Sequence, residues 1–251
     1  MNTILVWDIP TRLLHWAFAL SLTASIGIGF LVDDDNPLFQ THMVFGITAL
    51  FLLVIRLILG FSGSRHARFA NFPLRPREIA GYIRSALIDK TKRYSGHNPG
   101  SAVATVVMFL LVPALFITGI VRGGEAFEEG HEIFAWVLLA VILLHLMGIA
   151  LHTIRHRENI GASMITGKKA GEPTESIRSA QPLLGALLLI AVGTWITALF
   201  ANHDSNSATV KIPLIGKSIQ LGEMEDGEKE HKKTKHDHES RREKHDHNDD
   251  D

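Results

Sequence analysis

The chain has 251 residues, of which 46% are hydrophobic, and its 25 Lys and Arg residues nearly balance 26 Asp and Glu residues. It contains no cysteine, which excludes disulfides and every cofactor site that needs a thiolate ligand. No feature of the sequence indicates a nucleic-acid partner. The balanced charge hides a split, because basic and acidic residues gather in different parts of the chain.

Five stretches are apolar and close to the length of about 20 residues that a membrane-spanning helix needs. They are residues 13–32, 39–61, 102–121, 132–153 and 183–201. Five such stretches leave too little polar sequence to cover them in water, so we predict an all-α integral membrane protein. Arg56 lies near one end of its stretch, where its side chain could reach the lipid headgroups.

Charge in the connectors predicts the orientation. The connectors at 62–101 and 154–182 are rich in Lys and Arg. The connectors at the opposite end are acidic, with Asp33, Asp34, Asp35, Glu125, Glu128 and Glu129. By the positive-inside rule, the two basic connectors and the N-terminus are predicted to be cytoplasmic, and the C-terminus is predicted to lie outside. Residues 1–12 lack a basic n-region, so the first stretch is predicted to be a retained anchor.

Four histidines lie inside or at the ends of these stretches, where an ionisable side chain by default indicates a functional site. His15 lies at the cytoplasmic end of the first stretch, whereas His42 and His131 lie at the outer ends of the second and fourth. His145 follows His131 by 14 residues, about 21 Å along a helix and nearly on the same face. The predicted pairs are His15 with His145 toward the cytoplasm and His42 with His131 toward the exterior.

Two imidazoles at each depth predict two bis-histidine haem sites. Two neutral nitrogen donors fill both axial positions of the iron, which suits electron transfer rather than oxygen chemistry. A single membrane histidine could instead hydrogen-bond to another helix, but the matched depths disfavour this reading for all four. Small residues that would let a flat macrocycle approach the helices accompany them: Gly27, Gly29, Gly46, Gly119 and Gly148.

His152 offers an alternative to one of these ligands. It follows His145 by seven residues, so both lie on one helix face about 10 Å apart. His152 could replace His145 as the axial ligand, bind a haem propionate, or lie at the water interface without a site role. We prefer His145, because His152 adjoins the charged residues 155–157 at the membrane edge.

Other polar side chains near the predicted sites are candidate partners for the anionic haem propionates. Arg12 lies one turn before His15 and is the candidate at the cytoplasmic side, and Arg122 is the candidate near the outer face. His66 and His97 fall in the long basic connector. For these two we predict exposure to solvent or contact with a propionate rather than ligation.

Several spaced motifs in the first two thirds of the chain suggest a family. They are VWDIPTRLLHW at 6–16, GSRHARF at 63–69, GHNP at 96–99, the histidines and Glu132 within 131–152, and RHREN with ITG within 155–167. These motifs resemble the bacterial cytochrome b561 family, which includes the cytochrome b subunits of nickel–iron hydrogenases. The resemblance covers about residues 4–168.

The resemblance implies a four-helix bundle with two b haems, embedded in membrane lipid. Such a bundle passes electrons between a quinone pool and a redox partner, such as a c-type cytochrome. By resemblance, the axial ligands correspond to His15, His42, His131 and His145. The partner, the direction of electron flow and the quinone site are not implied, and whether the chain is a quinol oxidoreductase or only an electron-transfer subunit stays open.

The chain departs from this family after residue 171. We predict a haem domain at 1–168, a cytoplasmic linker at 169–182, a fifth transmembrane helix at 183–201, and an exported, charged and largely disordered tail at 202–251. An alternating apolar piece at 210–221 could form a small hairpin or pair with a partner. The histidines of the tail could bind zinc, copper or nickel weakly.

The predicted function is therefore transmembrane electron transfer through two b haems, between the quinone pool and a periplasmic or membrane redox partner. An alternative is a metal or proton transporter lined by histidines, with a tail that gathers metal. Transporters usually carry acidic residues near the midplane, and these spans carry essentially none, which favours haem. A third hypothesis is a membrane anchor for a soluble redox enzyme.

Overall fold

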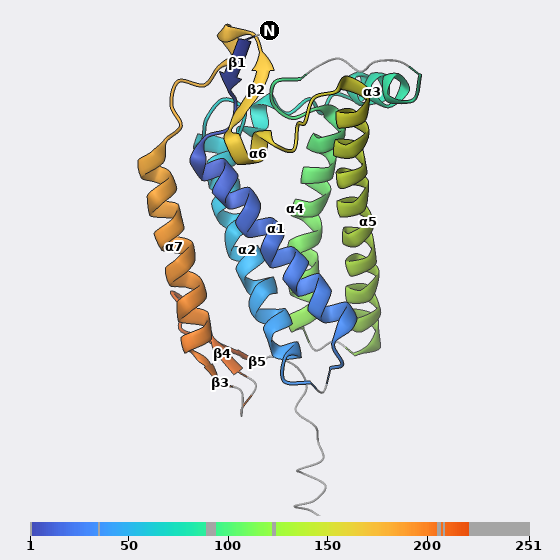
Figure 1. Cartoon of the computed structure of the whole chain (residues 1–251). Coiled ribbons are helices and arrows are strands. Elements are labelled where there is room, and N and C mark those ends of the chain that lie inside the picture. The colour runs from blue at the N-terminus through green and yellow to red at the C-terminus, as the bar shows by residue number, and fades with distance from the viewer. Residues whose placement is uncertain are drawn as a thin grey trace, which may run out of the picture.

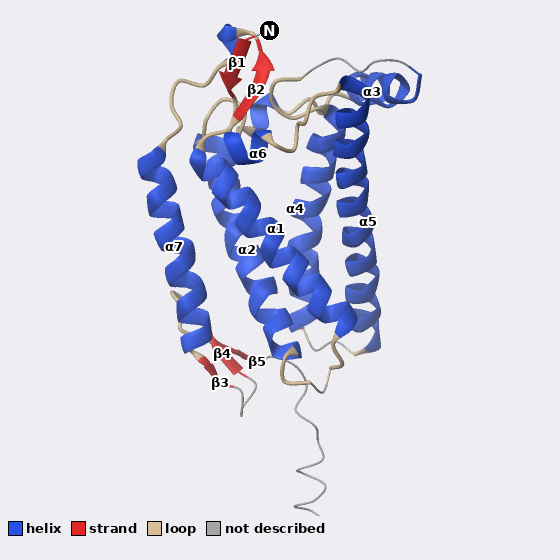
Figure 2. Ribbon diagram, viewed as in Figure 1, coloured by secondary structure: helices blue, strands red, loops and turns tan. Residues whose placement is uncertain are grey.

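The computed structural model describes residues 2–34, 36–88, 94–121, 124–204, 207 and 209–220. Five helices in this part of the chain are long and apolar enough to cross a membrane. They are α1 (Ile9–Leu31), α2 (Phe39–Ser62), α4 (Pro99–Ile120), α5 (Glu125–His156) and α7 (Pro182–Ala201). Figure 2 shows that helices dominate the fold. The predicted all-α membrane fold is confirmed.

The first four long helices form an upright bundle (Figure 1). Helix α1 packs chiefly against α2, and α4 packs chiefly against α5. Helix α7 stands beside the bundle and packs against α1 and α2, with Leu188 and Val192 in a core shared with Leu14 and Leu52. The predicted fifth helix is therefore part of the folded unit and packs on the bundle of its own chain.

Polar residues just before two spans fix where those helices begin. Asp8 caps α1, because its side chain accepts a hydrogen bond from the Thr11 amide at 2.8 Å. Asn98 caps α4 in a reciprocal capping box with Ser101, and proline in the first turn of both helices is preset for helical geometry. Both helices thus begin earlier than the apolar runs at 13–32 and 102–121 suggest.

Helix α5 shows the largest difference from its predicted span of 132–153. It begins at Glu125, so Glu125, Glu128 and Glu129 lie on the helix rather than in a connector. Carboxylates in the first turn interact favourably with the positive end of the helix dipole. Charge therefore ends the apolar run without ending the helix.

One end of the bundle, here termed the basic end, carries the N-terminus and the connectors 63–98 and 157–181 (Figure 1). Strands β1 (Asn2–Leu5) and β2 (Lys168–Gly171) pair antiparallel there. The short helices α3 (Pro76–Ile88) and α6 (Ser163–Thr166) lie at the same end. Two single 3-10 turns complete it, Phe69–Asn71 and Pro173–Glu175. The start of the predicted linker at 169–182 is thus paired with the N-terminal strand.

The opposite end, here termed the acidic end, carries the α1–α2 and α4–α5 turns. Strands β3 (His203–Asp204), β4 (Thr209–Lys211) and β5 (Ser218–Gln220) form an antiparallel sheet there. Val210 and Ile212 pack with Trp195 and Leu199 of α7. The apolar piece at 210–221 therefore contributes a hairpin that packs against the C-terminal end of α7. Residues 221–251, with the histidine-rich tail, lie outside the described residues.

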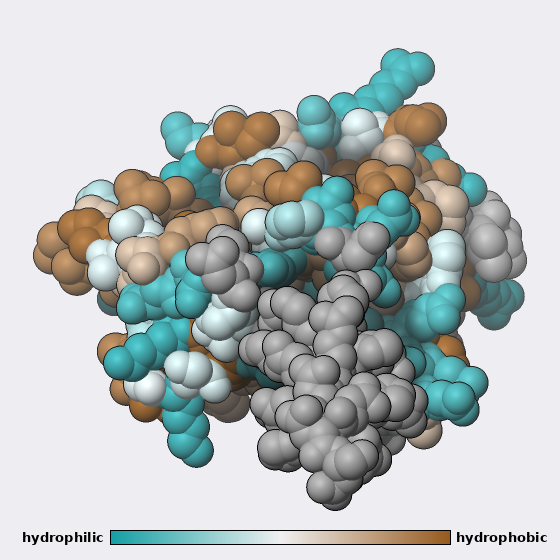
Figure 3. Space-filling view, turned by 90° about the horizontal axis from the view of Figure 1, so that it is seen from below, coloured by the Kyte–Doolittle hydropathy of each residue, from teal (hydrophilic) through white to brown (hydrophobic). Residues whose placement is uncertain are grey.

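The sides of the bundle are apolar. On α5, Leu143, Leu144 and Met147 are 57%, 59% and 60% exposed. Large apolar side chains on one continuous face suit lipid rather than water. In the view onto the acidic end, hydrophobic side chains gather on the left, where α7 stands in Figure 1, and hydrophilic ones lie across the end (Figure 3).

Candidate functional site

The structure brings together one predicted pair of histidines at the acidic end. His42 of α2 and His131 of α5 are both half-buried, and their ring centroids lie 6.1 Å apart with 68° between the ring planes. A separation of this size accommodates one metal ion between two imidazole nitrogens with bonds of about 2 Å each. The two side chains fit an iron with two axial imidazoles.

The backbone of neighbouring helices orients both rings. His42 Nδ1 lies 2.7 Å from the carbonyl oxygen of Ser25, and His131 Nδ1 lies 3.1 Å from that of Leu115. The Thr118 hydroxyl also contacts His131 Nδ1, at 3.1 Å. A carbonyl can only accept a hydrogen bond, so each Nδ1 carries the proton and each Nε2 lone pair is left for a metal.

Two glycines let these helices come close enough for that arrangement. A Cβ at Gly29 would lie 2.8 Å from His42 Nδ1, and one at Gly119 would lie 3.2 Å from His131 Cε1. Both glycines therefore make room for an imidazole rather than only for a macrocycle. Two others of the predicted set have open space around them, Gly27 and Gly148.

The second predicted pair lies toward the basic end. His15 of α1 and His145 of α5 are half-buried and close enough for their charges to interact. His15 packs edge-on against Trp16, with 5.6 Å between the ring centroids. Within the described residues neither histidine makes a hydrogen bond. This pair is thus brought together without the carbonyl partners that hold the pair at the acidic end.

Two connector histidines, the buried His66 and the half-buried His97, lie at the same end, and His97 is within electrostatic range of His15 and His145. The Trp7 ring packs edge-on against His97 at 5.0 Å and His66 at 6.3 Å. Burial, followed by the charge of Arg56, lowers the pKa of His97 to about 3. Burial also lowers the pKa of His66, whose Nε2 lies 2.8 Å from the carbonyl oxygen of Glu175. The solvent-exposed alternative is wrong for His66, which Trp7 and the carbonyl of Glu175 cover. Contact with a propionate stays a prediction for both histidines.

Arg56 points inward rather than toward the headgroups, so that prediction is wrong. Its Nη2 donates to the carbonyl oxygen of Ala67 at 3.1 Å. Its guanidinium carbon lies 5.1 Å from the centroid of the Phe69 ring and 5.7 Å from that of Phe109. The connector after α2 folds back over the helix end and supplies Ala67 and Phe69, and α4 supplies Phe109.

Arg12, the predicted propionate partner, reaches the turn after α5. Its Nη1 donates to the carbonyl oxygen of Ile165 in α6, while its Nε is buried without a hydrogen-bond partner in the described part of the chain. Its role toward a propionate stays a prediction. Arg122, the candidate at the other end, lies outside the described residues.

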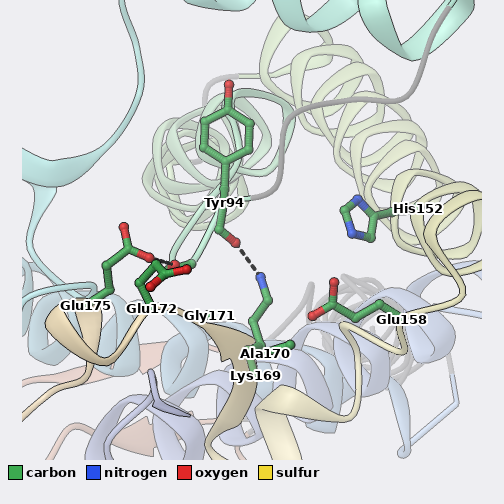
Figure 4. A pocket seen from close by; sticks show the side chains of 9 residues that line it. Tyr94, His152, Glu158, Lys169, Ala170, Gly171, Glu172 and Glu175 are labelled. Carbon is green, nitrogen blue, oxygen red and sulfur yellow. Dashed lines mark hydrogen bonds between the residues drawn. The ribbon is translucent and has the colours of Figure 1, made fainter. Parts of the chain in front are cut away.

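His152 lines a polar pocket of about 170 Å³ at the basic end, with Glu158, Lys169 and Tyr94 (Figure 4). Lys169 Nζ donates to the Tyr94 carbonyl oxygen at 2.6 Å, and burial lowers the pKa of Lys169. The pocket is smaller than the roughly 300 Å³ at which ligand sites usually begin. It gives His152 a polar environment but does not identify a ligand.

Within the described residues, no group of three or more His, Cys, Asp or Glu side chains is arranged to hold a metal ion. Paired histidines near both ends of an apolar helical bundle instead define the architecture of a membrane-embedded b-type cytochrome, in which the macrocycle supplies the other iron ligands.

Comparison with known proteins agrees with this class. Residues 6–167 match the family described as prokaryotic cytochrome b561, and the chain belongs to that family. Membership implies membrane electron transfer through b-type haem. The resemblance seen in the sequence motifs is thereby confirmed.

Two relatives carry the name probable Ni/Fe-hydrogenase B-type cytochrome subunit. The one from Bradyrhizobium diazoefficiens is 24% identical over 215 residues, which is 66% of this chain and 86% of the relative. The one from Rhizobium leguminosarum bv. viciae is 24% identical over 218 residues, which is 67% of this chain and 89% of the relative. No solved structure matches the chain significantly.

Proposed function

We propose that the chain carries electrons across the membrane through two b haems, one at each histidine pair. His42 and His131 are the axial ligands at the acidic end, and His15 and His145 are those at the basic end. The observation that carries the proposal is the 6.1 Å separation of the His42 and His131 rings. Each ring has its Nδ1 bound to a carbonyl and its Nε2 available.

A bound b haem supplies reversible one-electron chemistry at its iron. The residues of this chain would hold and orient it: two neutral imidazoles at each pair would ligate the iron and leave no position for oxygen. The surrounding apolar helices exclude water from the path. Helix α5 contributes one histidine to each pair, 14 residues apart in sequence, and so spaces the two sites by about 21 Å along its axis.

The orientation proposed is that of the positive-inside rule, with the basic end in the cytoplasm and the acidic end in the periplasm of the inner membrane. The basic end carries exposed arginines in the connector after α2, among them Arg65, Arg68, Arg75, Arg77 and Arg84. In this orientation residues 1–168 form the haem domain. Helix α7 closes one side of the bundle, and the sheet of β3–β5 faces the periplasm.

The proposed partners are a quinone in the bilayer and a redox protein at the periplasmic face. The names of the two relatives point to a hydrogenase as one such protein, and a c-type cytochrome is the other class we propose. A quinol or quinone exchanges protons with its electrons, and the pocket of His152, Glu158 and Lys169 offers protonatable groups at the basic end.

The test is a reduced-minus-oxidised spectrum of the purified protein, with extracted haem counted per chain. Two b haems with low-spin bands are expected, because two imidazoles give a strong axial field at both irons. A protein without haem that instead binds zinc or nickel would overturn the proposal and revive the transporter hypothesis.

A further inference from the structure

The guanidinium of Arg56 is within electrostatic range of His15 at the basic end. Among the described residues it has no acidic hydrogen-bonding partner. Arg56 uses Nη2 on the carbonyl oxygen of Ala67, but its Nη1 is buried without a hydrogen-bond partner in the described part of the chain. Burying a charge or a donor without a partner is costly. A group that accepts hydrogen bonds at this point would offset that cost.

A polar atom of a second side chain in the same region also lacks a partner. The Nδ1 atom of His97 is buried and has no hydrogen-bond partner among the described residues. The ring bonds to the backbone of His66 through its other nitrogen, so Nδ1 of the neutral imidazole is an acceptor and not a donor. The charge of Arg56 acts on His97, as do the charges of His145 and His15. Arg56 and His97 therefore lie together within electrostatic range of the proposed basic-end ligands.

Aromatic rings enclose these two side chains. Phe69 and Phe109 flank the guanidinium of Arg56. Phe72 lies 4.4 Å from the His97 ring, and Trp7 lies 5.0 Å from it. An apolar enclosure excludes bulk water and strengthens each electrostatic interaction inside it.

The carboxylate of Asp8 does not satisfy this donor of Arg56. Asp8 interacts electrostatically with Arg56, but its side chain accepts the hydrogen bond of the Thr11 amide and caps α1. No ion pair of Arg56 is present among the described residues. An anionic acceptor from outside the chain fits this arrangement, and a haem b carries its only anionic groups on its two propionates.

We propose that Arg56 binds a propionate of the haem at the basic end. The inference rests on the proposed function, because it takes His15 and His145 as the ligands of that haem. It assigns the propionate contact to Arg56 because its Nη1 lacks a partner among the described residues and its charge acts on both His15 and His97. The cation favours the reduced iron, and so raises the potential of this haem relative to a site without it.

The test is a spectroscopic redox titration of Arg56→Gln, with haem counted per chain. At a fixed potential, the ratio of reduced to oxidised iron in the basic-end haem should fall about tenfold. This corresponds to a midpoint potential that is lower by about 59 mV for one electron. The acidic-end haem should not change. The matched control is Arg84→Gln, which removes an exposed arginine of the same connector and should leave both potentials unchanged. Equal potentials in the two variants would overturn the proposal.

A second arm separates a propionate contact from a general effect of charge. The apoprotein is reconstituted with haem b or with its dimethyl ester, in which both propionates are neutral. The decrease in midpoint potential caused by Arg56→Gln should be at least halved with the ester. An equally large decrease with the ester would overturn the propionate assignment. His97→Leu, which removes a neutral ring and no charge, should change the redox equilibrium of this haem by less than the tenfold effect of Arg56→Gln.

Outcomes of other kinds are also decisive. Wild-type protein that binds no haem refutes the proposed function itself, whereas two haems with no change in Arg56→Gln refute only this inference. If Arg56→Gln does not assemble, Arg56→Lys is titrated instead. A basic-end potential that differs from the wild-type value with haem b but not with the dimethyl ester supports the propionate contact, and every other result overturns it.

Discussion

The two ends of the bundle hold their histidine pairs in different ways. At the acidic end, the carbonyl oxygens of Ser25 and Leu115 orient His42 and His131. At the basic end, His15 and His145 make no hydrogen bond within the described residues; the charge of Arg56 acts on His15 there instead. The histidines of one pair are oriented by hydrogen bonds to carbonyls, and those of the other lie within electrostatic range of a cation.

This difference has an electronic consequence. A carbonyl that accepts a hydrogen bond from Nδ1–H makes Nε2 a stronger electron donor to the iron, which favours the ferric state. A nearby cation such as Arg56 favours the ferrous state. We therefore expect the acidic-end haem to have the lower potential. Electrons would then run downhill from the acidic end to the basic end.

The largest effect is expected from removing a ligand. His131→Ala should lose the acidic-end haem and keep the other, and His145→Ala should do the converse, so that haem per chain falls from two to one in each. The reason is that an imidazole supplies an axial bond that alanine cannot. Extracted haem and the spectrum of the remaining haem measure this outcome.

The control for the basic end is His152→Ala. It should keep both haems, because His152 lines the polar pocket beside Glu158 and Lys169. Retention of two haems by His145→Ala together with loss of one by His152→Ala would show that the ligand at this end is His152.

A smaller loss is expected where a helix approaches a ligand. In Gly29→Ala the new Cβ would lie 2.8 Å from Nδ1 and 2.9 Å from Cε1 of His42, so the imidazole must move. We expect a loss of about tenfold or more in haem affinity at the acidic end, as for other groups that orient a metal ligand. Haem titration into the apoprotein measures it, and the basic-end haem should bind as before.

A glycine of α7 supplies the control, because that helix carries no proposed ligand. Gly193→Ala places a Cβ in open space and should leave both affinities unchanged, since alanine is the better helix former by about 0.5–1 kcal/mol. Equal haem affinities in the two alanine variants would show that contact between Gly29 and His42 does not position the ligand.

These examples show what the sequence can predict. The five spans follow from the lengths of the apolar runs, and the pairing of His42 with His131 follows from the position of each histidine along its span. Both inferences depend only on the rise per residue of a helix. The roles of Gly29 and Arg56 depend on which helix or connector packs against them. The pairing of Leu5 with Lys168 joins strands far apart in the chain, and short polar segments carry no periodicity that predicts it.

The smallest effect is expected from hydroxyls that supplement the carbonyl contacts. Ser25 Oγ lies 3.3 Å from His42 Nδ1, and Thr118 Oγ1 lies 3.1 Å from His131 Nδ1. Ser25→Ala and Thr118→Val leave the backbone carbonyls in place, so each should raise the potential of the acidic-end haem by less than a tenfold change in its redox equilibrium, or less than about 59 mV.

Potentiometric titration measures this shift, with Thr105→Val as the matched control. Thr105 lies on the same helix as Thr118 and bonds in the same way to the carbonyl four residues earlier, but it contacts no proposed ligand. A rise confined to Ser25→Ala and Thr118→Val would reduce the difference in midpoint potential between the two haems by raising the potential of the acidic-end haem. Arg56→Gln should reduce the same difference by lowering the potential of the basic-end haem. Equal shifts in all three hydroxyl variants would mean that Nδ1 hydrogen bonding does not set the difference between the two ends.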